Sequence, residues 1–243
     1  MVPLTRHGTR EMLIGSVVLL GVASVLGWWH WPLSLIVIPV LIWLFAFFRD
    51  PERAVPVEQH TMVSPADGKV SDITEIDDDP LLGGPAVRVG IFLSVFNVHV
   101  NRSPCDGVVV DVNYKKGKFI NAMSHSKASD ENESNTIILK EPNGPRPVAV
   151  VKQIVGLIAR RIICTVKPTD RVDRGQRIGM IKFGSRTELS IPKWLEPTIQ
   201  VKVGDTVRGA MDVIATLGKP IHTTHRKEAG DEFEPLVGRE TPA

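Results

Sequence analysis

The sequence has little cysteine and no excess of charge of either sign. Its 243 residues include two cysteines, Cys105 and Cys164, and no Cys-x-x-Cys pair. That cysteine content excludes a disulfide-stapled secreted fold and a thiolate zinc site. With 29 Lys and Arg against 27 Asp and Glu, the net charge is +2, whereas nucleic acid binding takes a concentrated basic stripe. The composition therefore indicates an intracellular or membrane-facing globular protein with no nucleic acid partner.

Charge is also missing from one long stretch near the N-terminus. Residues 12–48 contain no Asp, Glu, Lys or Arg, and 28 of these 37 residues are apolar, including four of the five tryptophans. A Gly-Trp-Trp-His-Trp-Pro sequence at residues 27–32 interrupts the run. The two remaining segments would be about 27 and 24 Å long as helices, against a hydrocarbon core of about 30 Å. Two short spans and a re-entrant hairpin both fit these lengths.

The flanks of this apolar run indicate its orientation. Arg6 and Arg10 precede it, Arg49 and Arg53 follow it, and the turn between its halves is uncharged and rich in tryptophan. Basic flanks stay in the cytoplasm and tryptophan favours the membrane interface. We therefore expect residues 1–48 to form a helical hairpin in the cell (inner) membrane, with the rest of the chain on the cytoplasmic side.

Two alternatives compete with the membrane hairpin. A signal peptide would use Arg6 and Arg10 as its basic segment, but a second apolar segment follows at once. A hairpin buried in a soluble core would normally carry a polar face, and this run has none.

From residue 49 onward the pattern changes to short β-type runs separated by Gly, Pro, Asn and Asp, so the fold class is mainly β. The turns at residues 64–70 and 203–207 each place an acidic residue and Gly beside alternating Val and Ile. This pattern is typical of a β-sandwich or barrel-sandwich hybrid resembling biotinyl- and lipoyl-type domains. We expect a β-rich catalytic domain over residues 49–220 and a flexible polar tail over residues 221–243. The predicted strands are 87–100, 107–114, 136–140, 148–158, 161–166, 177–183 and 198–203, with alternation resuming after residue 185.

The most informative stretch is residues 174–189, where an alternating strand ends at Phe183 and a Gly184-Ser185 turn follows. Glycine reaches backbone angles that other residues avoid, so the Ser185 hydroxyl can be poised against the preceding carbonyl. A Gly-Ser pair taken alone is most often an ordinary hairpin turn.

Four ordered features give this turn its meaning: an apolar hairpin, SPADG at residues 64–68, FNVHVNRSPCDG at 96–107 and RGQRIGMIKFGSR at 174–186. Together they resemble the phosphatidylserine decarboxylase proenzymes, specifically the short bacterial and archaeal-like branch, over about residues 49–215. The resemblance implies self-cleavage between Gly184 and Ser185, giving a β chain of residues 1–184 and an α chain of residues 185–243 that form a heterodimer. It also implies that Ser185 becomes a pyruvoyl group, with no external cofactor and no metal.

The implied activity is decarboxylation of phosphatidylserine to phosphatidylethanolamine and CO2. A Schiff base between the substrate amine and the pyruvoyl ketone would take up the electrons that decarboxylation leaves on the α-carbon. The implied partners are therefore a phospholipid and the membrane that contains it. Decarboxylation of another serine-headed lipid, such as archaetidylserine, stays open. A non-enzymatic, membrane-anchored biotinyl-like carrier would need a lysine at the hairpin tip, where this chain has Gly184-Ser185.

The resemblance assigns catalysis to Ser185, His99 and Asp67. Asp67 in SPADG and His99 in NVHVNRSP match family positions linked to self-cleavage and proton transfer, tasks that need a base near the serine. The long forms carry two histidines spaced three apart, whereas this chain has His99 and then Arg102, so the division of roles between Asp67 and His99 stays open. Each residue also has a plainer interpretation, Asp67 as a turn former and His99 as a core residue.

Binding of the lipid phosphate and of metal is less clearly encoded. Arg102, Arg186 and Lys182 are candidates for the phosphate, since arginine presents a bidentate fork, although charged strand residues are usually just solvated. His125 precedes an acidic segment at residues 130–133, but their spacing matches no metal-ligand pattern. We expect no metal site.

Overall fold

The computed structural model describes residues 3–120, 129–157, 161–182 and 184–221. The loop with His125 lies outside these residues, as do Phe183 and the predicted tail after Ile221.

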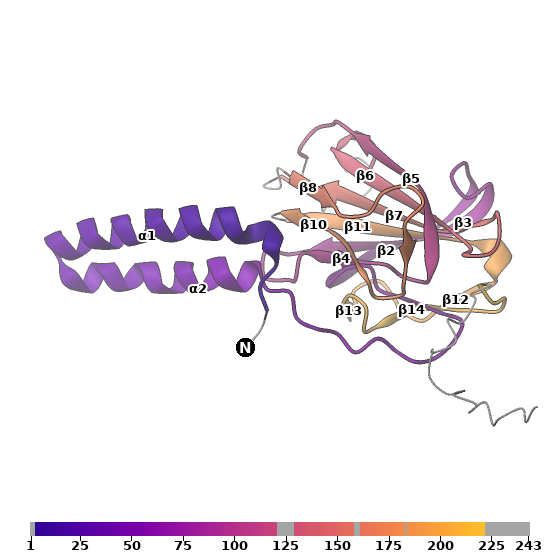
Figure 1. Ribbon diagram of the computed structural model, residues 1–243, viewed down its shortest axis with the longest axis horizontal. Coiled ribbons are helices and arrows are strands. Elements are labelled where there is room, and N and C mark those ends of the chain that lie inside the picture. Colours follow the sequence, from indigo (N-terminus) through magenta and orange to yellow (C-terminus); the bar gives the residue numbers. More distant parts are fainter. Residues whose placement is uncertain (1–2, 121–128, 158–160, 183, 222–243) are drawn as a thin grey trace, which may run out of the picture.

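The N-terminal segment forms the predicted helical hairpin. A short 3-10 turn, η1 (Arg6–Gly8), leads into helix α1 (Thr9–Trp29), a second 3-10 segment, η2 (Trp31–Ile36), and helix α2 (Val37–Phe47). The chain reverses at His30, whose backbone is extended, and Pro32 begins the next helical turn. In Figure 1 the two helices lie side by side and project from one end of the β domain.

Most of the hairpin surface is apolar and uncovered by protein. The segment Arg6–Trp29 is long and apolar enough to cross a membrane by length and composition, and its most apolar window is only 6% buried. The second helix is shorter, at 11 residues. A core hairpin would be covered by the rest of the fold, so this exposure argues against that alternative and for association with a membrane.

The remainder is mainly β, as predicted, and its largest element is a curled antiparallel sheet (Figure 1). The core lies on the concave side of this sheet, where Leu189 and Ile191 of the central strand are fully buried. Residues Arg186 and Glu188 alternate with them on the opposite face. In spatial order the strands are β13 (Thr206–Val207), β2 (Gly68–Asp79), β3 (Gly84–Leu93), β11 (Ser185–Pro192), β7 (Pro147–Val155), β6 (Ser134–Lys140), β5 (Gly107–Lys115) and β9 (Arg171–Val172).

Two three-stranded sheets complete the described β structure. One joins β4 (Val100–Arg102), β10 (Arg177–Lys182) and β8 (Arg161–Cys164), and it lies at the end of the domain that meets the hairpin (Figure 1). The other joins β1 (Thr61–Val63), β14 (Val213–Leu217) and β12 (Pro197–Ile199), with the 3-10 turn η3 (Lys193–Leu195) preceding β12.

Three strand predictions need correction. The single strand expected over residues 87–100 is two strands, because a turn at residues 94–97 interrupts it. In that turn the Asn97 side-chain oxygen accepts hydrogen bonds from the Ser94 amide (2.9 Å) and hydroxyl (2.8 Å). The strand expected over 198–203 ends at Ile199. Strand β2 was not predicted, since its many acidic residues hide the alternation of its buried positions.

Candidate active site

The Gly184-Ser185 turn connects the small β4-β10-β8 sheet to the centre of the large sheet. Gly184 has a φ of +42°, which a residue with a side chain adopts at a cost. Ser185 starts β11 in register with Leu93 of β3 and Val155 of β7. Its hydroxyl is fully buried and has no hydrogen-bond partner among the described residues. A buried hydroxyl without a partner is costly, which makes Ser185 Oγ a candidate for a chemical role.

His99 lies immediately before β4 and carries a second buried atom without a partner. Its Nδ1 atom is 3.0 Å from the Asn97 carbonyl oxygen, so Nδ1 carries the ring proton and donates it there. The other ring nitrogen, Nε2, is buried and has no partner among the described residues. Burial lowers the pKa of His99 to about 4, with the nearby charge of Arg49 acting in the same direction. At neutral pH the imidazole is therefore uncharged, with Nε2 as a proton acceptor.

The strand pairing brings Ser185 and His99 to the same corner of the domain. The Ile181 amide of β10 donates a hydrogen bond to the His99 carbonyl at 3.2 Å. Ile181 also packs in one buried cluster with Val155, the residue in register with Ser185. The sequence separates these two residues by 86 positions, and this chain of contacts through Ile181 and Val155 links them in the fold.

A buried network of hydrogen bonds joins the strands around this corner. Thr187 shares the face of β11 with Ser185, and its hydroxyl accepts a hydrogen bond from the Asn101 side chain at 3.0 Å. The Asn101 oxygen accepts from Gln153 at 2.9 Å, and the Gln153 oxygen accepts from Asn135 at 2.9 Å. Networks of this kind hold backbone segments in one arrangement when every member is satisfied. Sequence analysis missed all three amide residues, although Asn101 lies within the NVHVNRSP motif.

Asp67 lies near this corner but is held by other partners. Its carboxylate is 2.6 Å from the Arg53 guanidinium and accepts a hydrogen bond from the Gly209 amide at 2.8 Å. Among the described residues no hydrogen bond joins Asp67 to His99 or Ser185. Burial raises the pKa of Asp67, and the Gly209 and Arg53 contacts offset only part of that increase.

Residues assigned to the membrane flank thus reach the site. Arg53 pairs with Asp67, and the charge of Arg49 acts on both Asp67 and His99. Arg49 itself donates to the carbonyls of Ala46 (2.6 Å) and Phe96 (2.7 Å), which joins the end of α2 to the loop before His99.

The end of α2 also covers His99 directly. The ring of Phe47 lies 4.3 Å from the imidazole, centre to centre, with 34° between the planes. Both Phe47 and Phe48 are buried, at 1% and 0% exposed. This contact contributes to the burial of His99, and no signal in the sequence distinguished Phe47 from its apolar neighbours.

The two arginines predicted to meet the lipid phosphate are engaged by the protein itself. Arg102 bonds to Asp50 at 3.0 Å and to the Gly175 carbonyl at 3.1 Å. Arg186 is fully buried and pairs with Asp72 (2.6 Å) and Glu188 (2.8 Å). Their geometry lends no support to a role in phosphate binding.

Gly90 of strand β3, which has no side chain, leaves space for the Arg186 guanidinium. A Cβ atom at Gly90 would lie 2.1 Å from the Arg186 guanidinium, so glycine is required there for the pair with Asp72. Arg186 therefore has a structural role in the sheet, as the buried ion-pair partner of Asp72 and Glu188.

No group of three or more His, Cys, Asp and Glu side chains gathers as a metal site within the described ranges. The candidates for acid–base chemistry in and near the corner are the serine, the imidazole and the carboxylate described above.

Comparison with known proteins identifies the family. The model of the phosphatidylserine decarboxylase family matches residues 40–215. A phosphatidylserine decarboxylase proenzyme of Rhodopirellula baltica is 45% identical over 213 residues, covering 88% of each chain. The proenzyme of Carboxydothermus hydrogenoformans is 44% identical over 207 residues (83% of this chain, 92% of the relative), and that of Ralstonia nicotianae is 42% identical over 189 residues (78% and 83%).

The β domain, its buried corner and these matches define a carboxy-lyase made as a proenzyme. The chain belongs to the phosphatidylserine decarboxylase family. The resemblance drawn from the four sequence features is thereby confirmed.

Proposed function

We propose that the chain cuts itself between Gly184 and Ser185 and then, using the pyruvoyl group so formed, decarboxylates phosphatidylserine to phosphatidylethanolamine and CO2. The observation that carries this proposal is that Ser185 Oγ and His99 Nε2 are both buried in one corner of the fold, each without a hydrogen-bond partner among the described residues. A nucleophile and a neutral base of this kind are what an acyl shift requires.

In the first step Ser185 Oγ adds to the Gly184 carbonyl carbon, and the peptide C–N bond breaks. The hydroxyl proton passes by way of His99 Nε2 to the freed nitrogen, leaving an ester between the two residues. Loss of the Ser185 Cα proton then expels the Gly184 carboxylate, and water converts the remaining dehydroalanine to a pyruvoyl group with release of ammonia. The left-handed backbone at Gly184 interrupts regular strand geometry directly before Ser185.

The residues around Ser185 suit the product. A pyruvoyl group supplies an electron sink for decarboxylation of an amine-bearing substrate. His99 has one ring nitrogen fixed by Asn97 and the other available to hold or deliver a proton within a site from which Phe47 excludes water. Asp67 holds the SPADG turn to Gly209 and Arg53. A direct part for Asp67 in self-cleavage stays a prediction.

The proposed fragments would stay together as a heterodimer. Strand β11 begins the fragment 185–243, while its neighbours β3 and β7 belong to the fragment 1–184. We place this assembly at the inner membrane, the hairpin inserted and the β domain on the cytoplasmic side, because basic residues flank both ends of the hairpin.

Replacing Ser185 tests the proposal. Ser185→Ala should give a single uncleaved, inactive chain, whereas Ser190→Ala, on the opposite face of the same strand, should process normally. Intact mass should show wild-type fragments 1–184 and 185–243, the smaller with a blocked N-terminus that reacts with hydroxylamine. Normal cleavage and decarboxylase activity in Ser185→Ala would reject the assignment.

A further inference from the structure

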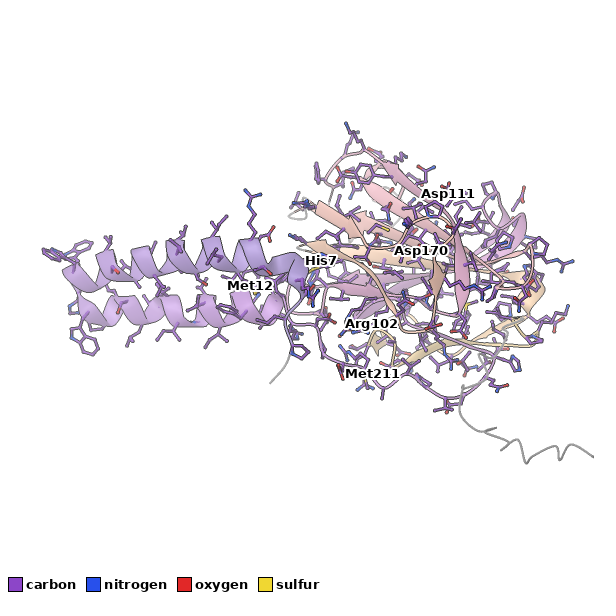
Figure 2. The ribbon with its side chains drawn as sticks, viewed as in Figure 1. His7, Met12, Arg102, Asp111, Asp170 and Met211 are labelled. Carbon is purple, nitrogen blue, oxygen red and sulfur yellow. The ribbon has the colours of Figure 1, made fainter. Side chains whose placement is uncertain are left out.

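A basic hollow lies where the membrane hairpin joins the β domain. It has a volume of about 520 Å³ and is formed by η1, the first turn of α1, and strands β8 and β10. In Figure 2, His7 and Met12 mark this junction. Its lining includes the charged side chains of Arg6, Arg10, Glu11, Arg161 and Lys182.

The charge of the hollow is strongly positive. Four cationic side chains face a single carboxylate, Glu11, which pairs with Lys182 at 2.5 Å. The side chains of Arg6, Arg10 and Arg161 form no ion pair within the described part of the chain. Guanidinium groups in this state are ready to bind an anion, and their planar fork matches phosphate.

The hollow lies next to the apolar surface of α1, which indicates that the anion it binds belongs to a lipid. Leu13, at its rim, is 66% exposed and begins the apolar surface of α1 that continues through Val17 and Val18. Cationic residues at the end of an apolar helix lie at the depth of the phospholipid headgroups. The phosphate layer would therefore meet Arg6 and Arg10 when the hairpin is inserted.

The hollow is also joined to the reacting segment. Lys182 ends β10, in register with Arg161 of β8, and only residues 183 and 184 separate it from Ser185. Lys182 is 5% exposed and lies over the Phe48 ring at 5.9 Å, next to the Phe47 that covers His99. In a serine phospholipid only a few bonds separate the phosphorus from the amine, so the phosphate site and the reaction site must be neighbours.

We propose that this hollow, with Arg10 and Arg161 as its principal ligands, binds the phosphodiester of the substrate phospholipid. The proposal rests on the proposed function for the identity of the substrate, and it replaces Arg102 and Arg186 as the phosphate ligands. The apolar side chains Leu13 and Ile163 would face the glycerol and the start of the acyl chains.

The first test measures binding without turnover. In an uncleaved Ser185→Ala background, the double variant Arg10→Gln/Arg161→Gln should raise the Kd for monomeric dihexanoyl phosphatidylserine at least tenfold, measured by calorimetry in detergent. The matched control is Lys202→Gln, which removes an exposed cation outside the hollow and should leave the Kd unchanged. An unchanged Kd in the double variant would overturn the proposal.

The second test separates this site from the self-cleavage chemistry and from simple membrane attraction. With Ser185 intact, the double variant should cleave itself as the wild type does, while its KM for phosphatidylserine in detergent micelles rises at least tenfold and kcat changes little.

Flotation with phosphatidylcholine vesicles, with and without phosphatidylglycerol, measures binding of the variant to membranes. If the variant lost only binding to phosphatidylglycerol vesicles and kept its KM, the hollow would be an anionic-membrane anchor and the proposal would be wrong. Absence of cleavage in the wild type would instead refute the proposed function and leave the Kd comparison valid.

Discussion

At the scale of single residues, the proposed self-cleavage depends on a neutral His99 whose Nε2 atom has no hydrogen-bond partner among the described residues. The ring is fully buried, one nitrogen is fixed by the Asn97 carbonyl, and the pKa falls to about 4. Below the pKa the ring would carry a proton on Nε2 and lose its capacity as a base. Ser185 Oγ is likewise buried, with no hydrogen-bond partner in the part of the chain that the structure describes.

We expect His99→Asn to slow self-cleavage by about 10²- to 10⁴-fold, the usual contribution of a positioned base. Purified precursor, made in the presence of denaturant and then refolded, would be followed by denaturing gel electrophoresis. Circular dichroism would check that the variant folds, and His60→Asn, at the exposed turn before β1, is the control. A wild-type cleavage rate in folded His99→Asn would contradict the assignment.

The pH dependence of self-cleavage follows from the same pKa. Because the base form of His99 predominates above about pH 4, the wild-type rate should be nearly constant between pH 6 and 8 and should fall as the pH drops through about 4. A rate that instead halved near pH 6.5 would show an imidazole with an ordinary pKa.

At the scale of elements, the end of helix α2 forms one wall of the site. Phe47 packs on His99, and Arg49 joins Ala46 at the helix end to Phe96 in the loop before His99. In the proposed function the hairpin would therefore support the geometry around His99 in addition to holding the domain at the lipid surface. A truncated protein that begins at residue 48 would lack Phe47 and therefore this wall.

Phe47→Ala should expose His99 to water and raise its pKa from about 4 toward the ordinary value of 6.5, because burial is the main cause of the decrease. Titration of the imidazole resonances by NMR, in detergent and in a Ser185→Ala background, measures the change. Phe45→Ala on the exposed surface of the same helix is the matched control. An unchanged pKa in Phe47→Ala would mean that other contacts bury the imidazole.

At the scale of the whole molecule, the proposed cut would separate a central strand from both of its neighbours. Strand β11 lies between β3 and β7, and its Leu189 and Ile191 are fully buried in the common core. Two chains sharing one core should unfold as a unit, since neither buries enough apolar surface alone.

Leu189→Ala should destabilise the cleaved protein by about 2–5 kcal/mol, the usual cost of such a truncation in a core. Urea titration, read by fluorescence and by co-elution of the two fragments in detergent, should show both fragments changing at the same, lowered urea concentration. Thr198→Ala at an exposed position of β12 is the control. Release of the smaller fragment before the larger unfolds would show that they do not share a core.

Local sequence pattern determined much of this protein. The charge-free run of residues 12–48 required a hairpin with an apolar surface, and alternation of Val and Ile required strands for most of the domain. The Gly184-Ser185 turn between two such strands, with its neighbouring motifs, was enough to identify the family and to make Ser185 the candidate for self-cleavage. These features depend on residues close in sequence, so their physics is visible in the sequence itself.

Only the tertiary structure decided which distant side chains meet. Burial and hydrogen bonding between strands far apart in sequence place Asn101 under Thr187, Phe47 on His99 and Arg53 on Asp67. The same long-range pairing turns Arg186 into a buried ion-pair partner and leaves Arg161 facing a basic hollow. A side chain's charge is fixed by its type, but its partners and its solvation depend on the packing of the whole chain.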